Sequence, residues 1–233
     1  PLSTSEAEKL ATALLTVNTK QAKRIALESG GNPNFVYELA SLVNFEVTHQ
    51  GSGGAISQLD LDDALWARVR RLERTPQALL EVLGVSGRPT PLRFIYEAAG
   101  INSSGLPGLA LLRAGHLIRR SGPGLDDEVE CFHDRIRETI VAHLDPPTQT
   151  RHHLGLARSL ESAADSDSEA IAFHYQGAGE FEPAGLHYSK AAAQAAKALA
   201  FERAANLYRK TLQFSHLNKE EKREIQIKLA DAL

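Results

Sequence analysis

Two short motifs in the chain combine residue types that could contact a phosphate group or a nucleotide base. The first is Gly31-Asn32-Pro33, in which a glycine able to stop one helix is followed by a proline able to begin the next. The second is Phe132-His133-Asp134, placed where a β-capable run meets a helix. A histidine at a helix N-terminus lies where free amides favour anions. A plain helix break and a structural histidine would also explain these residues.

The sequence lacks the motifs that would make this chain an enzyme by itself. It contains no Gly-x-x-x-x-Gly-Lys-Ser/Thr run, so the loop that cradles phosphates in P-loop NTPases is not encoded. No Gly-x-Gly-x-x-Gly stands between a strand and a helix. The single cysteine, Cys131, falls in a β-capable run, and we expect it to pack as a small core residue. We therefore expect no catalytic residue here.

Nine histidines raise the question of a metal site. His152 and His153 are adjacent, so their side chains diverge on a helix, and no cysteine or carboxylate completes a zinc spacing. We interpret both as solvated helix positions and expect no bound metal. Because Cys131 has no second cysteine to pair with, the chain has no internal disulfide and fits a reducing compartment.

Composition and charge indicate a globular chain of the cytoplasm. Hydrophobic residues make up 42%, charged residues 24%, and the net charge is −3. No apolar run approaches the roughly 18 residues of a membrane span, so we expect no membrane partner. A dedicated nucleic-acid binder usually has a pI above about 9, and the value here is about 6.3. Arg113, Arg119 and Arg120 alone would supply few phosphate contacts, which argues against DNA as a partner.

The elements that must position the first motif are expected to be helices. Ser3 and Glu6 form a capping-box pair, and apolar residues recur at helical spacing after them. Further helices are expected at 19–29, at 34–47 and from Asp62 onward, with a glycine-rich loop at 50–55. Both ends of the chain indicate a piece of a longer protein, because it starts at Pro1 without methionine and stops within a helical pattern.

The middle of the chain has the element order of a winged helix. Three short helices are expected at 79–83, 92–99 and 106–114, closed by Gly84, Gly100 and Gly115. Two β-capable runs, 117–120 and 128–132, then flank a Gly-Pro-Gly turn and predict one small hairpin. No central sheet is expected.

The last part of the chain, from about residue 148, is expected to be helical and contains an internal repeat. A pattern of phenylalanine, alanine and tyrosine recurs after twenty residues: Phe181, Ala184 and Tyr188, then Phe201, Ala204 and Tyr208. Small residues beside large ones at helical spacing let paired helices pack closely, so we predict stacked helical hairpins. The spacing is one helix and a turn, shorter than a full tetratricopeptide unit of about 34 residues.

Together and in this order, the motifs resemble the region after the nucleotide-binding core of signal-transduction NTPases with numerous domains (STAND), a branch of the AAA+ ATPases. The similarity is nearest to bacterial ATPase modules fused to serine/threonine kinase or cyclase domains. In that family a helical lid carries a Gly-x-Pro motif whose proline borders the adenine, as Gly31 and Pro33 would here. A winged-helix domain carries a Met-His-Asp motif whose histidine reaches the ADP β-phosphate. His133 and Asp134 match it, with Phe132 in place of methionine.

The resemblance implies a mainly α fold: a helical lid (1–65), a winged-helix domain with one small β-hairpin (66–147) and helical hairpins like those of tetratricopeptide repeats (148–233). It implies a non-catalytic regulatory fragment that senses ADP against ATP, contacts a nucleotide-binding domain outside this chain, and binds a protein or small-molecule effector through its repeats. ATP or ADP with Mg²⁺ would belong to the longer protein. Two alternatives are a winged-helix DNA-binding regulator whose repeats form a dimer or a sensor, and a purely structural scaffold.

Overall fold

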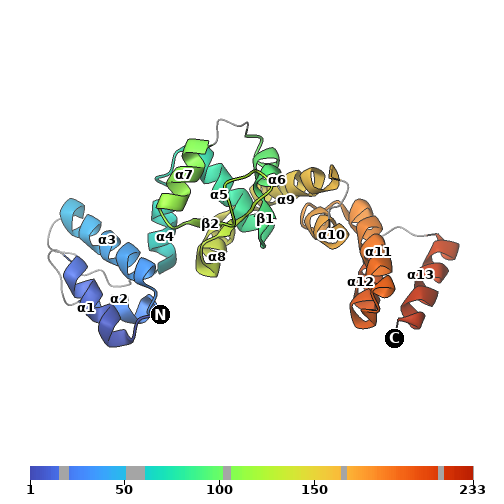
Figure 1. Ribbon diagram of the computed structural model, residues 1–233, viewed down its shortest axis with the longest axis horizontal. Coiled ribbons are helices and arrows are strands. Elements are labelled where there is room, and N and C mark those ends of the chain that lie inside the picture. Colours follow the sequence, from blue (N-terminus) through green and yellow to red (C-terminus); the bar gives the residue numbers. More distant parts are fainter. Residues whose placement is uncertain (16–20, 51–60, 102–105, 164–166, 215–217, 233) are drawn as a thin grey trace. The chain divides into compact units, whose positions relative to one another are not determined.

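The computed structural model describes residues 1–15, 21–50, 61–101, 106–163, 167–214 and 218–232 (Figure 1). Within these residues the chain has thirteen helices and one three-stranded antiparallel sheet. This confirms the expected mainly α fold. The helices group into two compact units: unit 1 contains Pro1–Glu73 and His133–His143, and unit 2 contains Arg74–Phe132 and Leu144–Leu233. The three-part division at residues 65 and 147 stays a prediction.

Unit 1 is made of helices only. Its elements are α1 (Thr4–Leu14), α2 (Ala22–Glu28), α3 (Pro33–Gln50), α4 (Leu61–Val69) and α8 (Asp134–His143). The first helix begins as expected, because the Ser3 and Glu6 side chains form a capping box. Helices α1, α2 and α3 pack on one another, α3 contacts α4, and α4 contacts α8. Their inner faces form the core with Ala11, Ile25, Val36, Leu39, Val43, Leu65, Val69, Ile136 and Ile140. The predicted loop at 50–55 lies almost wholly outside the described residues.

Unit 2 begins with helices around a small sheet. In chain order the elements are α5 (Arg74–Ser86), β1 (Thr90–Pro91), α6 (Leu92–Ala98), α7 (Leu106–Ala114), β2 (Ile118–Arg120) and β3 (Glu128–Cys131). The strand order is β1-β3-β2, with Ile118 opposite Cys131 and Thr90 opposite Val129. The expected β2–β3 hairpin is confirmed. Strand β1 was not expected, because two residues cannot show an alternating pattern; its Pro91 fits an edge strand.

One of the three predicted glycine stops is wrong. Gly84 lies inside α5 and is buried there, so the helix continues to Ser86 and the left-handed residue is Gly87 (φ +68°). Helix α7 ends at Ala114 directly before Gly115, as predicted, and the left-handed residue of the turn that follows is His116 (φ 53°). The prediction for α6 is confirmed, since Gly100 follows that helix with φ +65°.

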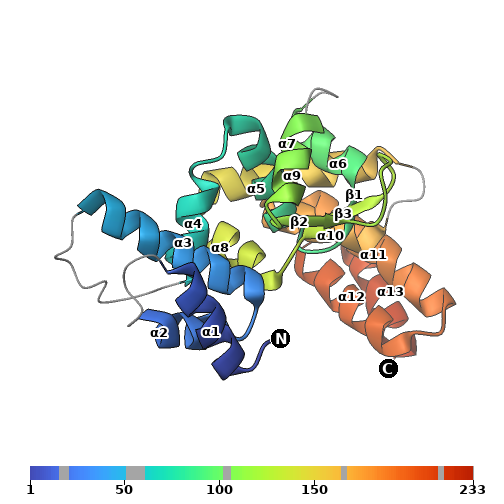
Figure 2. The same ribbon diagram turned by 60° about the vertical axis from the view of Figure 1, so that its left-hand side comes forward.

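The rest of unit 2 is a succession of helices, each packed on the next. They are α9 (Pro146–Glu161), α10 (Ser168–Gly177), α11 (Phe181–Lys197), α12 (Phe201–Phe214) and α13 (Lys219–Asp231). Figure 2 shows α11 and α12 lying side by side, with α13 next to them. Helix α9 also packs on α5 and α6, so one helix joins the region around the sheet to the helical hairpins. No helix in the described ranges is both long and apolar enough to cross a membrane.

Candidate functional site

The Gly-x-Pro motif forms a tight turn between α2 and α3. Gly31 has φ +76°, and a Cβ atom there would lie 2.2 Å from the carbonyl oxygen of Leu2. The Leu2 amide also donates a hydrogen bond of 2.7 Å to the Gly31 carbonyl. Both the backbone conformation and the close approach require glycine at this position.

The next two residues start α3. The Asn32 side-chain oxygen accepts a hydrogen bond of 3.0 Å from the Asn34 amide, which is the usual arrangement of an N-terminal cap. Pro33 is the first residue of α3, where its missing N–H group costs no hydrogen bond. Its ring is exposed, so the turn presents an apolar surface that a planar base could cover.

His133 lies between β3 and α8 and is exposed. Its Nδ1 atom accepts a hydrogen bond of 3.3 Å from the Arg135 amide, so the ring of His133 caps α8. Asp134 is the exposed first residue of the helix. Because Nδ1 accepts, the proton of the neutral imidazole is on Nε2, which makes Nε2–H a donor for an outside group.

The start of α3, directly after the first motif, contacts the second motif within unit 1. Phe35, two residues after Pro33, is buried, and its ring packs edge to face against His133 with centroids 4.8 Å apart and an interplanar angle of 70°. This contact joins residues about a hundred positions apart in the chain. It fixes the imidazole beside the start of α3, so Gly31, Pro33, His133 and Asp134 all belong to one compact unit.

Helix α8 is held in place by α4. The Asp62 carboxylate accepts hydrogen bonds from Arg135 Nε (2.8 Å) and from the Thr139 hydroxyl (2.7 Å). The Trp66 ring stacks on His143, with centroids 4.6 Å apart. Arg135 pairs with Asp62, so it positions α8 and is not a free cation at the site.

The chemistry available at this site is binding. It offers one neutral N–H donor on His133, an exposed proline ring on Pro33 and the first turn of a helix, which together suit a phosphate oxygen and a base. Among the described residues, no group of three or more histidine, cysteine, aspartate or glutamate side chains is arranged to hold a metal ion. Cys131 is half-buried at the end of β3.

The residues of the internal repeat divide into a buried set and a partly exposed set. Ala184, Tyr188, Ala204 and Tyr208 are buried in the core of the helical hairpins, whereas Phe181 and Phe201 remain about half exposed at the helix starts. The Tyr188 hydroxyl donates a hydrogen bond of 2.6 Å to Gln176. Burial raises the pKa of Tyr188 to about 12, so this hydroxyl stays a neutral donor.

Two of the histidines that we expected in solvent are structural. His152 is buried, and its Nε2 atom lies 3.2 Å from the Glu81 carboxylate on α5. His153 is half-buried and contacts His174 on α10. Their side chains do diverge, as adjacent helix positions must. The expectation of solvation is wrong because α9 is covered on two sides, by α5 and by α10, which a single helix pattern does not reveal.

Two of the arginines considered for DNA are engaged inside the hairpin. Arg119 donates through Nε to Glu130 at 2.7 Å, and Arg120 donates through Nη2 to the Gly124 carbonyl at 2.8 Å. Arg113 is exposed in the last turn of α7. The described part of unit 2 therefore holds few cations ready for a phosphate backbone near the hairpin.

Comparison with known proteins gives a likeness among solved structures. No protein-family model matches the chain, and no curated protein is significantly similar to it. Among solved structures, the chain is similar to a Signal Transduction ATPase with Numerous Domains (STAND) protein with a tetratricopeptide repeat sensor from Pyrococcus horikoshii, at 16% identity and a TM-score of 0.42. The likeness covers 99% of this chain and 38% of that one, so our chain spans well under half of that protein's length.

Proposed function

We propose that this chain is the regulatory part of a STAND-type signalling ATPase. Its first motif and His133 sense ADP against ATP, and its helical hairpins sense a protein or small-molecule effector. The contact between Phe35 and His133 carries the proposal, because it brings together two motifs that a nucleotide sensor needs at one place. A helix break and an unrelated structural histidine would have no reason to meet.

The proposed sensing uses one hydrogen bond. His133 Nε2–H donates to a β-phosphate oxygen of ADP, while Pro33 borders the adenine. The nucleotide, its Mg²⁺ and the P-loop belong to a nucleotide-binding domain in the longer protein, together with any fused bacterial kinase or cyclase domain. Because a ligand shifts an equilibrium only through differential affinity, the His133 contact must weaken when ATP replaces ADP. The closed state then loses its extra stabilisation.

The chain order supplies the link from nucleotide to output. His133 follows β3 after a single residue, and α8 leads into α9 after two residues. The order α5-β1-α6-α7-β2-β3 supports a winged-helix domain in front of His133, and the succession α9 to α13 supports a repeat sensor behind it. Effector binding to the repeats and nucleotide binding at His133 would thus bias one equilibrium from two sites.

The rival function, a winged-helix DNA-binding regulator, has less support. Arg119 and Arg120 are each engaged inside the hairpin, and the chain is acidic overall. A DNA-binding role would need these side chains to leave their partners for phosphates.

The deciding experiment replaces His133 in the longer protein. A hydrogen bond to a charged group contributes about 1.5–3 kcal/mol, so His133→Ala should weaken ADP binding or shift the closed–open equilibrium by about 10- to 150-fold. His133→Gln, which keeps an N–H donor, should recover part of this loss. The matched control is Glu138→Ala, an exposed change on the same helix.

The melting temperature of the same variants is then measured on the isolated chain. Because the His133 ring caps α8 and packs against Phe35, the Ala variant should lower the melting temperature of the chain modestly whether or not His133 binds nucleotide. Such a fall with unchanged ADP affinity in the longer protein would show that His133 only caps α8, and the proposed function would then be wrong.

A further inference from the structure

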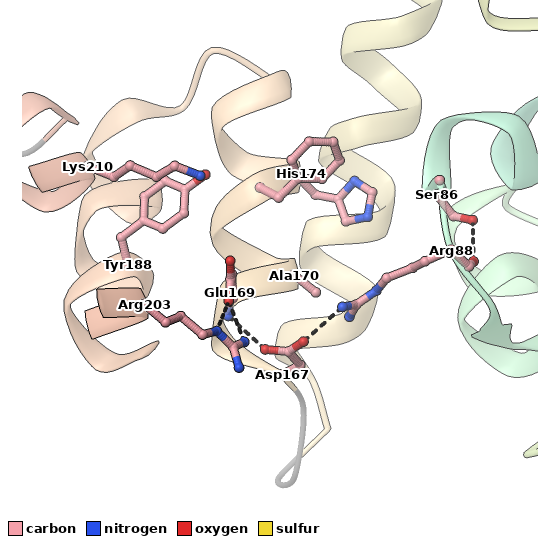
Figure 3. A pocket seen from close by; sticks show the side chains of 11 residues that line it. Ser86, Arg88, Asp167, Glu169, Ala170, His174, Tyr188, Arg203 and Lys210 are labelled. Atoms are coloured by element: carbon pink, nitrogen blue, oxygen red, sulfur yellow. Dashed lines mark hydrogen bonds and ion pairs between the residues drawn. The ribbon is translucent and has the colours of Figure 1, made fainter. Parts of the chain in front are cut away.

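A hollow of about 390 Å³ opens in unit 2, whereas His133 belongs to unit 1 (Figure 3). Its floor is one face of α10, carrying Glu169, Ala170, Phe173 and His174. Arg88, from the turn after α5, lies on one side, and α11 and α12 form the other side. Pockets for small molecules measure about 300–1,000 Å³, so this volume suits a small molecule better than a folded partner.

The charged groups around the hollow leave a surplus of one positive charge. Arg88 Nη1 donates to Asp167 at 2.8 Å, and Arg203 Nε donates to Glu169 at 2.9 Å, so each carboxylate already has a cation. The third cation is Lys210, whose Nζ atom lies 4.8 Å from the centre of the Tyr188 ring. Figure 3 shows Lys210 and Tyr188 together on the side opposite Arg88.

The arginines keep spare donors. A guanidinium has five N–H groups, and the paired carboxylates fix the orientation of Arg88 and Arg203 without using all of them. An anion placed between Arg203 and Lys210 would therefore meet donors that are already oriented. Such preorganisation lowers the entropy cost of binding.

The floor adds an apolar surface. The Phe173 side chain is 49% exposed, although large apolar residues of a helix usually turn inward, and it lies beside Ala170 on the same face of α10. Neighbouring His174 is buried, and burial lowers its pKa to about 3. The floor therefore carries no histidine charge at neutral pH, and a ligand ring or alkyl group could cover Phe173.

We propose that this hollow binds a small organic anion, an aromatic or aliphatic molecule with one carboxylate or phosphate monoester group. The acid group binds Lys210 and Arg203, and the apolar part covers Phe173. Such an anion would be the class of effector that the repeats sense. Only this regulatory role rests on the proposed function. Binding itself is a property of unit 2 and needs no nucleotide.

The test uses 8-anilinonaphthalene-1-sulfonate, a fluorescent aromatic anion, with the purified chain at low salt. We expect saturable binding of one equivalent. Lys210→Gln and Phe173→Ala should each weaken the binding of this probe at least about 5-fold. The first removes the charged hydrogen bond to the acid group, and the second removes the apolar contact. Lys197→Gln removes an exposed lysine of α11 outside the hollow and should change the affinity less than about 2-fold. Lys210→Arg keeps the charge and should retain most of the affinity.

A neutral probe, N-phenyl-1-naphthylamine, separates charge from apolar contact, since its binding should not respond to Lys210→Gln. Phenyl phosphate and phenylacetate then compete with the anionic probe, and the stronger competitor identifies which acid group the site prefers. Every variant is checked by circular dichroism and thermal melting. The proposal is overturned by absent saturation, by equal loss in Lys197→Gln, or by binding confined to partly unfolded variants. Failure of nucleotide sensing at His133 would change none of these measurements.

Discussion

The Nδ1 atoms of His153 and His174 lie 3.0 Å apart and join α9 to α10. Two ring nitrogens at this distance need one donor and one acceptor, so the pair holds together only while at least one of these atoms is unprotonated. Burial is the main cause that lowers the pKa of His174 to about 3, and the nearby charges of His153 and Arg88 lower it further. The pKa of His153 is also lowered, mainly by burial and further by the charge of His152.

The first prediction is that acid destabilises unit 2 through this pair. Both pKa values are below the unfolded value of 6.5, so the folded state binds fewer protons than the unfolded chain. Stability from the pair is therefore complete above about pH 6.5 and is lost as the pH falls towards the folded pKa. The free energy of unfolding should fall by up to about 1.4 kcal/mol per pH unit for each histidine. Urea melts between pH 7.5 and 5 measure this slope.

His174→Gln should reduce the slope by about one proton, because glutamine does not titrate. His116→Asn is the control, since His116 is exposed and asparagine tolerates its positive φ. Carboxylates titrate at lower pH than these histidines. Burial raises the pKa of Glu81, but hydrogen bonds from His152 and Gln77 outweigh it and leave the pKa below 4.5. An unchanged slope in His174→Gln would refute the prediction.

The second prediction separates two neighbouring glycines. Gly30 and Gly31 both have positive φ, but a Cβ at Gly30 meets nothing within 4 Å, whereas a Cβ at Gly31 would overlap the Leu2 backbone. Gly30→Ala should cost about 1 kcal/mol of unfolding free energy from backbone strain alone. Gly31→Ala should cost at least about 1 kcal/mol more, because Leu2 must move. Equal costs in denaturant melts would mean that Leu2 does not pack at this turn.

The third prediction concerns catalysis by the isolated chain. It should not turn over ATP, since phosphate binding needs P-loop amides and a lysine that this sequence does not encode. Phosphate release by the purified chain is the measurement, and a mock purification is the control. Turnover above that control would reveal a site outside the two motifs.

The fourth prediction tests the packing of α11. Ala184 of this helix is fully buried in the core of the helical hairpins, so Ala184→Leu adds side-chain atoms where there is no space and should cost about 1–3 kcal/mol. Ala198→Leu, at an exposed helix end, is the matched control and should cost less than about 0.5 kcal/mol. Thermal melts compare them. Similar losses in both would mean that leucine itself, and not crowding, is responsible.

The fold could be predicted where local signals are strong. The Ser3 capping box, the β2–β3 hairpin and the helices of the last part all follow from spacing and turn residues. The extent of α5 could not, because Gly84 resembles a helix stop and only its buried packing shows otherwise. Strand β1 exists through its pairing with β3, which no two-residue segment can specify alone.

The site was predictable only as a set of residue types. The motifs around Pro33 and His133 are visible in the sequence, but the Phe35–His133 contact that joins them depends on how α8 packs in unit 1. The hollow beside α10 had no sequence signal. Arg88 and Lys210 lie more than a hundred residues apart, and neither belongs to a recognisable motif.

The insertion of α8 into unit 1 has a consequence for synthesis. Residues 74–132, which belong to unit 2, leave the ribosome between the two pieces of unit 1. Until α8 is made, Asp62 lacks Arg135 and Trp66 lacks His143, so a nascent chain ending near residue 73 holds an unfinished module. His133 and the helix that follows it thus join unit 1 only after the hairpin has emerged. Under the function that we propose, a nascent chain that ends before His133 would lack the nucleotide contact altogether, so the order of translation would itself delay sensing.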